Sequence, residues 1–271
     1  MFKKIMSSRY GLLILMVITV IIFMAVVMDM MPANVMRGED APVQEDITVY
    51  IAAGPQDSAD YQLAEKIAKS INDEGIDSQA VVSGSYAENM KKIIDGEAPM
   101  AIVLNSSLGA NADAASVIAQ LGQVYVQAFA TDGSSSLEEA AGKNIAVGIK
   151  DSAEAEAALA VLQLYGIGPD DFTPVYGDAA AALNNGEAEI AIIIGDLGSA
   201  DIGSASLLAL DNTDPNNTVF KKSVIPAGTY GQADDVATLS IDKVLVATST
   251  YSDGAFSILK SILDEALPEL L

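Results

Sequence analysis

From residue 47 onward, the chain alternates short apolar runs with longer alanine-rich stretches of helical periodicity. Runs in which nearly every position is apolar are typical of strands buried on both faces of a parallel sheet. The predicted strands are 47–53, 78–82, 100–104, 125–130, 144–148, 172–175, 190–194, 206–210 and 243–248. The predicted helices include 59–72, 86–95, 153–164 and 179–184. This alternation predicts an α/β fold built on parallel sheets.

The segment before residue 47 has a different pattern, with uncharged and mostly apolar residues from Gly11 to Met28. As a helix this run is about 27 Å long, close to the thickness of the hydrocarbon core of a membrane. Basic residues precede it, which predicts a cytoplasmic N-terminus and an exported remainder. We therefore expect a cytoplasmic tail, one transmembrane signal anchor and a linker at 1–10, 11–31 and 32–46.

A cleaved signal peptide is the alternative interpretation of the same segment. Its apolar core would be shorter, and a small-x-small cleavage site would follow the core. Here the residues that follow are Asp29, Met30, Met31 and Pro32. Both criteria favour an uncleaved anchor, which places the folded part on the periplasmic or outer face of the cell membrane.

Three short motifs occur twice in the same order along the exported part. GPQDSA at 54–59 is similar to GIKDSA at 148–153, the turn at Gly84 to that at Gly177, and GEAPMAI at 96–102 to GEAEIAI at 186–192. Internal similarity of this kind indicates that a structural unit is repeated. We therefore expect two similar α/β lobes.

Each copy of the first motif places an Asp-Ser pair between a strand and a helix: Asp57 with Ser58, and Asp151 with Ser152. Such residues can cap the free N–H groups of the helix. Helix N-termini at the carboxyl ends of parallel strands are also natural sites for anionic ligand groups. Capping alone and capping beside a carboxylate site both remain open.

Composition narrows the chemistry that the chain can perform. It has no His and no Cys, which excludes His general bases, thiol nucleophiles, thiolate zinc sites and disulfides. The net charge of −23 opposes binding to nucleic acid, and indicates either a solvated surface or a functional acidic patch. The Asp- and Asn-rich run at 211–217 lacks the spacing of a calcium loop. We expect no enzyme activity, no cofactor and no metal.

The sequence IPAGTY at 225–230, with Gly231, Gln232, Asp235 and Val236 after it, resembles the C-terminal signature of TAXI-type solute receptors of TRAP transporters. Further segments resemble the family in the same order: the first glycine-rich loop at 51–61, the second loop at 83–85, and the start of the second lobe at 147–154. The similarity covers about residues 47–265.

The resemblance implies a type II periplasmic-binding-protein fold, in which two crossing strands join two α/β lobes. The strands would be 125–130 and 243–248, lobe 1 would comprise 47–128 and 245–271, and lobe 2 would comprise 129–244. It also implies that a small organic anion, such as a carboxylate, is held between the lobes for an integral-membrane transporter.

The chain departs from the family in two ways. Asp57 and Asp60 stand in a first loop that is usually rich in glycine and threonine, and the receptors are usually released rather than anchored. Both features favour an alternative, in which a degenerate binding-protein fold serves as a structural or interaction subunit of a membrane complex without solute.

Few cations are available to hold an anion. The last arginine is Arg37 in the linker, so a bidentate arginine clamp within the fold is excluded. Lys150 is the lysine in a predicted cleft loop. We expect it either to contact a ligand anion or to form an ion pair at the surface.

Further candidates follow loop turns or buried strands. Tyr61, Tyr86 and Tyr230 could each offer a ring face and a hydroxyl, or simply pack at lobe edges. The polar residues Asn105, Ser106 and Asp196 follow buried strands and could reach the cleft, or form plain turns. The predicted ligand-binding residues are Gly54, Gln56, Asp57, Ser58, Tyr61, Ser83, Gly84, Ser85, Asn105, Ser106, Lys150, Asp151, Ser152, Asp196 and Tyr230.

Overall fold

The computed structural model describes residues 48–212 and 217–271. The tail, transmembrane anchor and linker expected at 1–46 lie outside these residues. Within the described ranges, no helix is long and apolar enough to cross a membrane.

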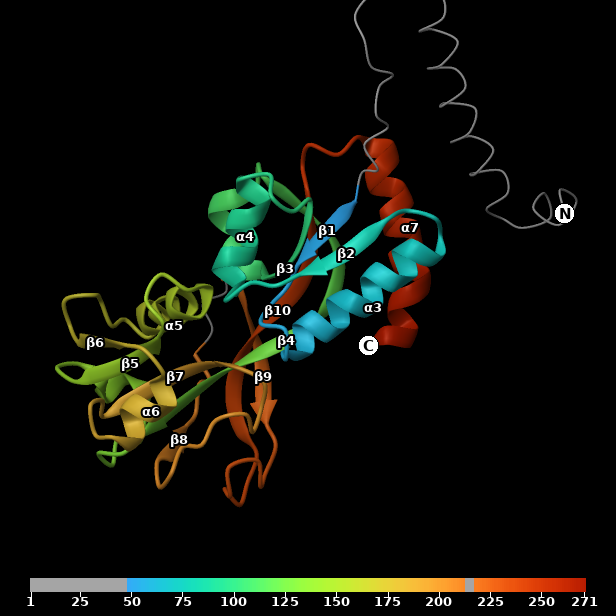
Figure 1. The fold of residues 1–271 in the computed structure, drawn as a ribbon. Coiled ribbons are helices and arrows are strands. Elements are labelled where there is room, and N and C mark those ends of the chain that lie inside the picture. Colours follow the sequence, from blue (N-terminus) through green and yellow to red (C-terminus); the bar gives the residue numbers. More distant parts are fainter. Residues whose placement is uncertain (1–47, 213–216) are drawn as a thin grey trace, which may run out of the picture. The chain divides into compact units, whose positions relative to one another are not determined.

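Within those ranges, ten strands form one mixed sheet, with the central order β2-β1-β3-β10-β4-β7-β5-β6 (Figure 1). One group of parallel strands comprises β1 (Val49–Ala52), β2 (Ser78–Val81) and β3 (Met100–Leu104). The other comprises β5 (Asn144–Gly148), β6 (Thr173–Tyr176) and β7 (Ile190–Gly195). The sheet is therefore parallel in each half, as predicted, but antiparallel strands separate the two halves.

Two long antiparallel strands, β4 (Ala115–Ala130) and β10 (Val236–Thr248), connect the halves. The C-terminal part of β10, from Lys243, pairs with β3. The C-terminal part of β4, from Tyr125, pairs with β7. The pairing of β4 with β10 shifts register between Lys243 and Val244 and again two residues later, and Gly122 opposite Lys243 has a φ of 126°. Such irregularities bend and twist a strand pair. The short strands β8 (Ser206–Leu208) and β9 (Phe220–Ile225) add to β4 and β10.

Helices and two 3-10 turns cover the sheet. They are α3 (Ala59–Asp73), α4 (Tyr86–Ile94), η1 (Asn105–Asn111), η2 (Leu137–Ala140), α5 (Ala153–Leu164), α6 (Ala179–Asn184) and α7 (Asp253–Leu270). In α3, apolar residues at helical spacing are buried, including Ile67 and Ile71. The buried alanines of α5 let that helix approach the sheet closely.

The two halves of the sheet have separate apolar cores. One is built around Ile51, Met100 and Leu245, and the other around Val126 and Leu162. Tyr86 at the start of α4 is partly buried and packs against both cores. The result is a two-lobed α/β fold with Tyr86 between its lobes.

The predicted elements agree with the structure where apolar patterning is strong. Helices α5 and α6 and strands β3 and β5 have the predicted bounds. The expected crossing strands cover only parts of β4 and β10, and β9 and α7 were not predicted. In these missed strand segments, exposed polar residues such as Gln120, Gln123 and Lys222 interrupt the apolar pattern. The strand predicted at 206–210 ends at Leu208.

Candidate functional site

A cavity of about 180 Å³ lies where loops of the first lobe meet the start of α5 in the second lobe. Its walls come from the loop between β1 and α3, from the loop between β2 and α4 with the first turns of α4, and from the first turn of α5. The lining residues are Gly54, Pro55, Ser58, Asp60, Gly84, Ser85, Tyr86, Asn89 and Glu154.

A serine caps the N-terminus of each of the three helices that surround the cavity. The Oγ atoms of Ser58, Ser85 and Ser152 accept hydrogen bonds from backbone N–H groups three residues further on, at 3.1–3.2 Å. Glycine is required at position 54, because a Cβ there would lie 2.7 Å from the Ser58 Oγ. The capping interpretation is therefore confirmed for the serines of both repeated motifs.

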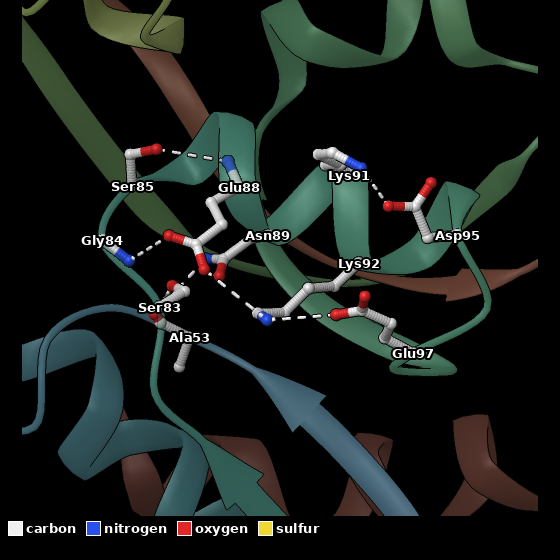
Figure 2. A network of polar contacts seen from close by, with 10 residues as sticks. All are labelled: Ala53, Ser83, Gly84, Ser85, Glu88, Asn89, Lys91, Lys92, Asp95 and Glu97. Carbon is white, nitrogen blue, oxygen red and sulfur yellow. Dashed lines mark hydrogen bonds and ion pairs between the residues drawn. The ribbon is translucent and has the colours of Figure 1, made fainter.

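Each of these helices also carries an acidic residue in its first turn, namely Asp60 in α3, Glu88 in α4 and Glu154 in α5. The Glu88 carboxylate accepts a hydrogen bond of 2.7 Å from the Gly84 N–H, as Figure 2 shows beside the Ser85 cap. Carboxylates are stabilised at the positive end of a helix dipole. The chain thus supplies its own anions at the helix ends where we expected a ligand anion.

Asp60 is fully partnered at the edge of the cavity. The Lys243 Nζ lies 2.5 Å from Asp60 Oδ1, and the Tyr86 hydroxyl donates to Oδ2 at 2.6 Å. The side chains of Lys243 and Asp60 are only 12% and 14% exposed. Burial, and then the negative charge of Asp60, raise the pKa of Tyr86 far above its ordinary value, so the phenol remains a donor. This network ties α3 and α4 to the irregular part of β10.

Two other groups in the cavity wall have no hydrogen-bond donor among the described residues: Asn89 Oδ1 and Glu154 Oε2 are both buried. Asn89 is 1% exposed, and its Nδ2 donates to the carbonyls of Ala53 at 3.3 Å and Ile102 at 2.7 Å. Carbonyl oxygens only accept, so these bonds fix the orientation of the amide. The free acceptor of Asn89 is therefore Oδ1.

Burial raises the pKa of Glu154, and nearby Asp60 contributes in the same direction. The backbone N–H at the helix start and the Ser152 hydroxyl offset only part of this effect. An ionised Glu154 is consequently unfavourable in the unliganded protein.

The structure brings together four of the predicted ligand-binding residues in the cavity wall: Gly54, Ser58, Gly84 and Ser85. Ser83 is buried and donates to the Ala53 carbonyl at 3.1 Å. The other predicted residues do not line the cavity.

Several predicted residues of the repeated loops point elsewhere. Gln56, Asp57, Lys150 and Asp151 are exposed, and Lys150 forms no ion pair with any residue that the structure describes. Tyr61 packs against the core of the first lobe. Lys150, the lysine that we expected to contact an anion, does not line this cavity.

Two predicted residues of the second lobe have structural roles. The Tyr230 hydroxyl accepts from the Gly198 N–H at 2.9 Å and donates to Gln127, and its ring packs edge-on against Phe129 with centroids 5.0 Å apart. Asp196 is exposed, and its backbone carbonyl accepts from the Ser199 hydroxyl at 2.7 Å.

Asn105 and Ser106 lie in η1, outside the cavity wall. Ser106 borders a different hollow of about 400 Å³ beside α5, and its buried hydroxyl has no hydrogen-bond partner among the described residues. A third hollow, of about 430 Å³, lies beside α6. Both are larger, but neither contains a buried, unpartnered carboxylate or amide among the described residues. We therefore place the candidate site in the smaller cavity.

The predicted set omitted Asp60, Asn89, Glu154 and Lys243, although the repeat contains a signal for two of them. Extended by one residue, the repeated motif reads GPQDSAD and GIKDSAE, so Asp60 and Glu154 occupy equivalent positions. For Lys243 the signal is a charge at the start of an otherwise apolar strand segment.

Replacing Lys243 with Met should lower the free energy of unfolding by about 3–5 kcal/mol, because it leaves Asp60 charged and largely buried without its cation. The double variant K243M/D60N should recover most of that loss. Urea unfolding of the two variants and of D60N measures the coupling. Independent, additive effects would contradict the ion pair.

The pKa of Glu154 is raised in the folded state, so the fold binds this proton more tightly than the unfolded chain does. The free energy of unfolding should therefore fall as the pH rises through that pKa, and Glu154→Gln should remove this dependence and stabilise the protein at neutral pH. Urea unfolding at pH values from about 4 to about 8 measures this pH dependence, since the range begins near the ordinary pKa of a glutamate and extends above it. Glu156→Gln, an exposed change on the same helix, is the control and should leave the pH dependence unchanged.

The fold matches that of periplasmic binding proteins. The substrate-binding protein of an amino acid ABC transporter aligns with a TM-score of 0.53 and 12% identity, over 83% of this chain and 93% of that one. The aliphatic sulphonate-binding protein SsuA of Escherichia coli aligns with a TM-score of 0.51 and 16% identity, over 82% and 72%. The alkanesulfonate-binding protein SsuA of Xanthomonas axonopodis pv. citri, bound to MOPS, aligns with a TM-score of 0.51 and 16% identity. The alignment covers 86% of this chain and 74% of that one.

At these identities the solved structures establish the fold alone. All three are described as binding proteins. No curated protein matches the chain. The model of the NMT1-like family matches residues 51–271, and the chain therefore belongs to the NMT1-like family.

Proposed function

We propose that the protein is an extracytoplasmic solute-binding protein that holds a small organic solute between its lobes and presents it to a membrane transporter. The observation that carries this proposal is the cavity at the junction of the lobes, with buried acceptors that have no donor in the described part of the chain. Buried polar groups without partners cost free energy, so they mark places where a ligand completes the hydrogen bonding.

The connection between the lobes suits a binding cycle. Lobe closure requires a few backbone positions that absorb a bend. The register shift of β10 at Lys243 and the positive φ of Gly122 opposite it are such positions. Because Lys243 also contacts Asp60 at the cavity, bending there would alter the shape of the site.

At a finer level, we propose a TAXI-type receptor of a TRAP transporter, held at the membrane by residues 11–31. The support is the sequence of the segment 225–230 and of the loops that align with the family, together with the apolar run near the N-terminus. One comparison protein is the substrate-binding protein of an amino acid ABC transporter, and the other two bind sulfonates, which makes both solute classes candidates here.

A second candidate function is a structural subunit without solute. Asp60, Tyr86 and Lys243 fill part of the space between the lobes with the protein's own side chains, and the remaining cavity is small compared with common ligand pockets of about 300–1,000 Å³. The two functions differ in whether any small molecule stabilises the fold.

A thermal-shift screen of the full-length chain in detergent distinguishes them. The panel should hold amino acids, alkanesulfonates, dicarboxylates and small amines, and native mass spectrometry should look for a solute that co-purifies. A ligand at about 100 times its Kd stabilises the native state by roughly 2.7 kcal/mol, which raises Tm by a few degrees. If no compound raises Tm and none co-purifies, the structural-subunit function replaces the proposed one.

A further inference from the structure

On the basis of the proposed function, we infer that the solute presents a protonated amine to Glu154 and Asn89. The inference concerns two residues that line the cavity, Glu154 and Asn89, whose Oε2 and Oδ1 atoms are buried without a donor among the described residues. It replaces the earlier expectation of an anionic solute.

The repeat explains why this wall is incomplete. Asp60 and Glu154 occupy equivalent positions in the two copies of the motif, and each stands in the first turn of its helix. Asp60 has an ammonium partner within the chain, since Lys243 Nζ lies 2.5 Å away. No described lysine pairs with Glu154, and the ammonium of a solute would occupy the corresponding place.

The charge of the site favours the same ligand. Asp60 and Lys243 neutralise each other, whereas an ionised Glu154 adds to the cavity wall a negative charge that pairs with no described lysine. A cation relieves this charge, whereas an anion would add to it at low effective dielectric. Asp60 is close enough to contribute to the raised pKa of Glu154.

The hydrogen-bonding groups also suit a donor-rich ligand. An ammonium offers three donors and no acceptor. It can serve both Glu154 Oε2 and Asn89 Oδ1, and the orientation of Asn89 is already fixed by its bonds to the Ala53 and Ile102 carbonyls. The backbone N–H groups at the three helix starts donate to serine Oγ atoms, and the Gly84 N–H donates to Glu88, so these N–H groups are not free to bind an anion.

The binding should depend on pH in a defined direction. Asp60 on α3 raises the pKa of Glu154, and Asp60, Glu154 and Asp196 after β7 all raise the pKa of Tyr86 on α4. Lys243 on β10 pairs with Asp60. Burial raises the pKa of Glu154, so lowering the pH neutralises it before an exposed carboxylate. The affinity for an amine should fall as the pH falls through that pKa.

The test compares ethanolamine and putrescine with the anions glycolate and succinate, by calorimetry on the full-length chain in detergent. We expect at least one amine to bind, and Glu154→Gln to weaken it by about tenfold or more, the effect of losing one charge-assisted hydrogen bond. Glu65→Gln removes an exposed carboxylate of α3 outside the cavity, and should leave the affinity unchanged. Both variants retain the shape of the side chain.

The outcomes separate the amine inference from the proposed function. If an anion or another solute binds while both amines fail, or if Glu154→Gln strengthens binding of an anion, the amine inference is overturned and the solute-binding function stands. If an amine binds equally well to Glu154→Gln, the inference is also overturned. If no solute of this panel or of the wider screen binds, both fail.

Discussion

The antiparallel pairing of β4 with β10 is the constraint on which the rest of the structure depends. These two strands carry the hydrogen bonds that join a parallel group of strands in one lobe to a parallel group in the other. Their register shift places Lys243 where its side chain reaches Asp60 at the start of α3. The same pairing that joins the lobes therefore brings Lys243 to the Asp60 carboxylate in the cavity wall.

The two copies of the repeated motif are used differently. In both, a serine caps a helix and an acidic residue follows two positions later. The first acid is neutralised by Lys243 and hydrogen-bonded by Tyr86, whereas the second retains a buried oxygen without a donor. The acidic residue of the first copy is therefore paired, whereas that of the second copy lines the cavity with an oxygen that has no donor among the described residues.

Much of the fold could be predicted from the sequence, because all-apolar strands, serine caps and alanine-rich helix faces are local signals. The missed parts of β4 and β10 have polar residues on an exposed face, which hides them from a search for apolar runs. The site was harder to predict. The loop glycines and the capping serines could be predicted from local motifs. Lys243, however, approaches Asp60 only through the pairing of strands distant in sequence. Tyr230 was predicted in the site, yet it packs on Phe129. Patterns along the chain do not determine such contacts.

The most direct test of this account is a high-resolution structure of the protein with its natural solute bound. We predict that a nitrogen atom of the solute lies about 2.7–3.2 Å from Glu154 Oε2 and from Asn89 Oδ1. The Asp60–Lys243 ion pair should remain intact beside it. A carboxylate or sulfonate group of the solute against Glu154, or a cavity closed by the protein's own side chains, would contradict the account.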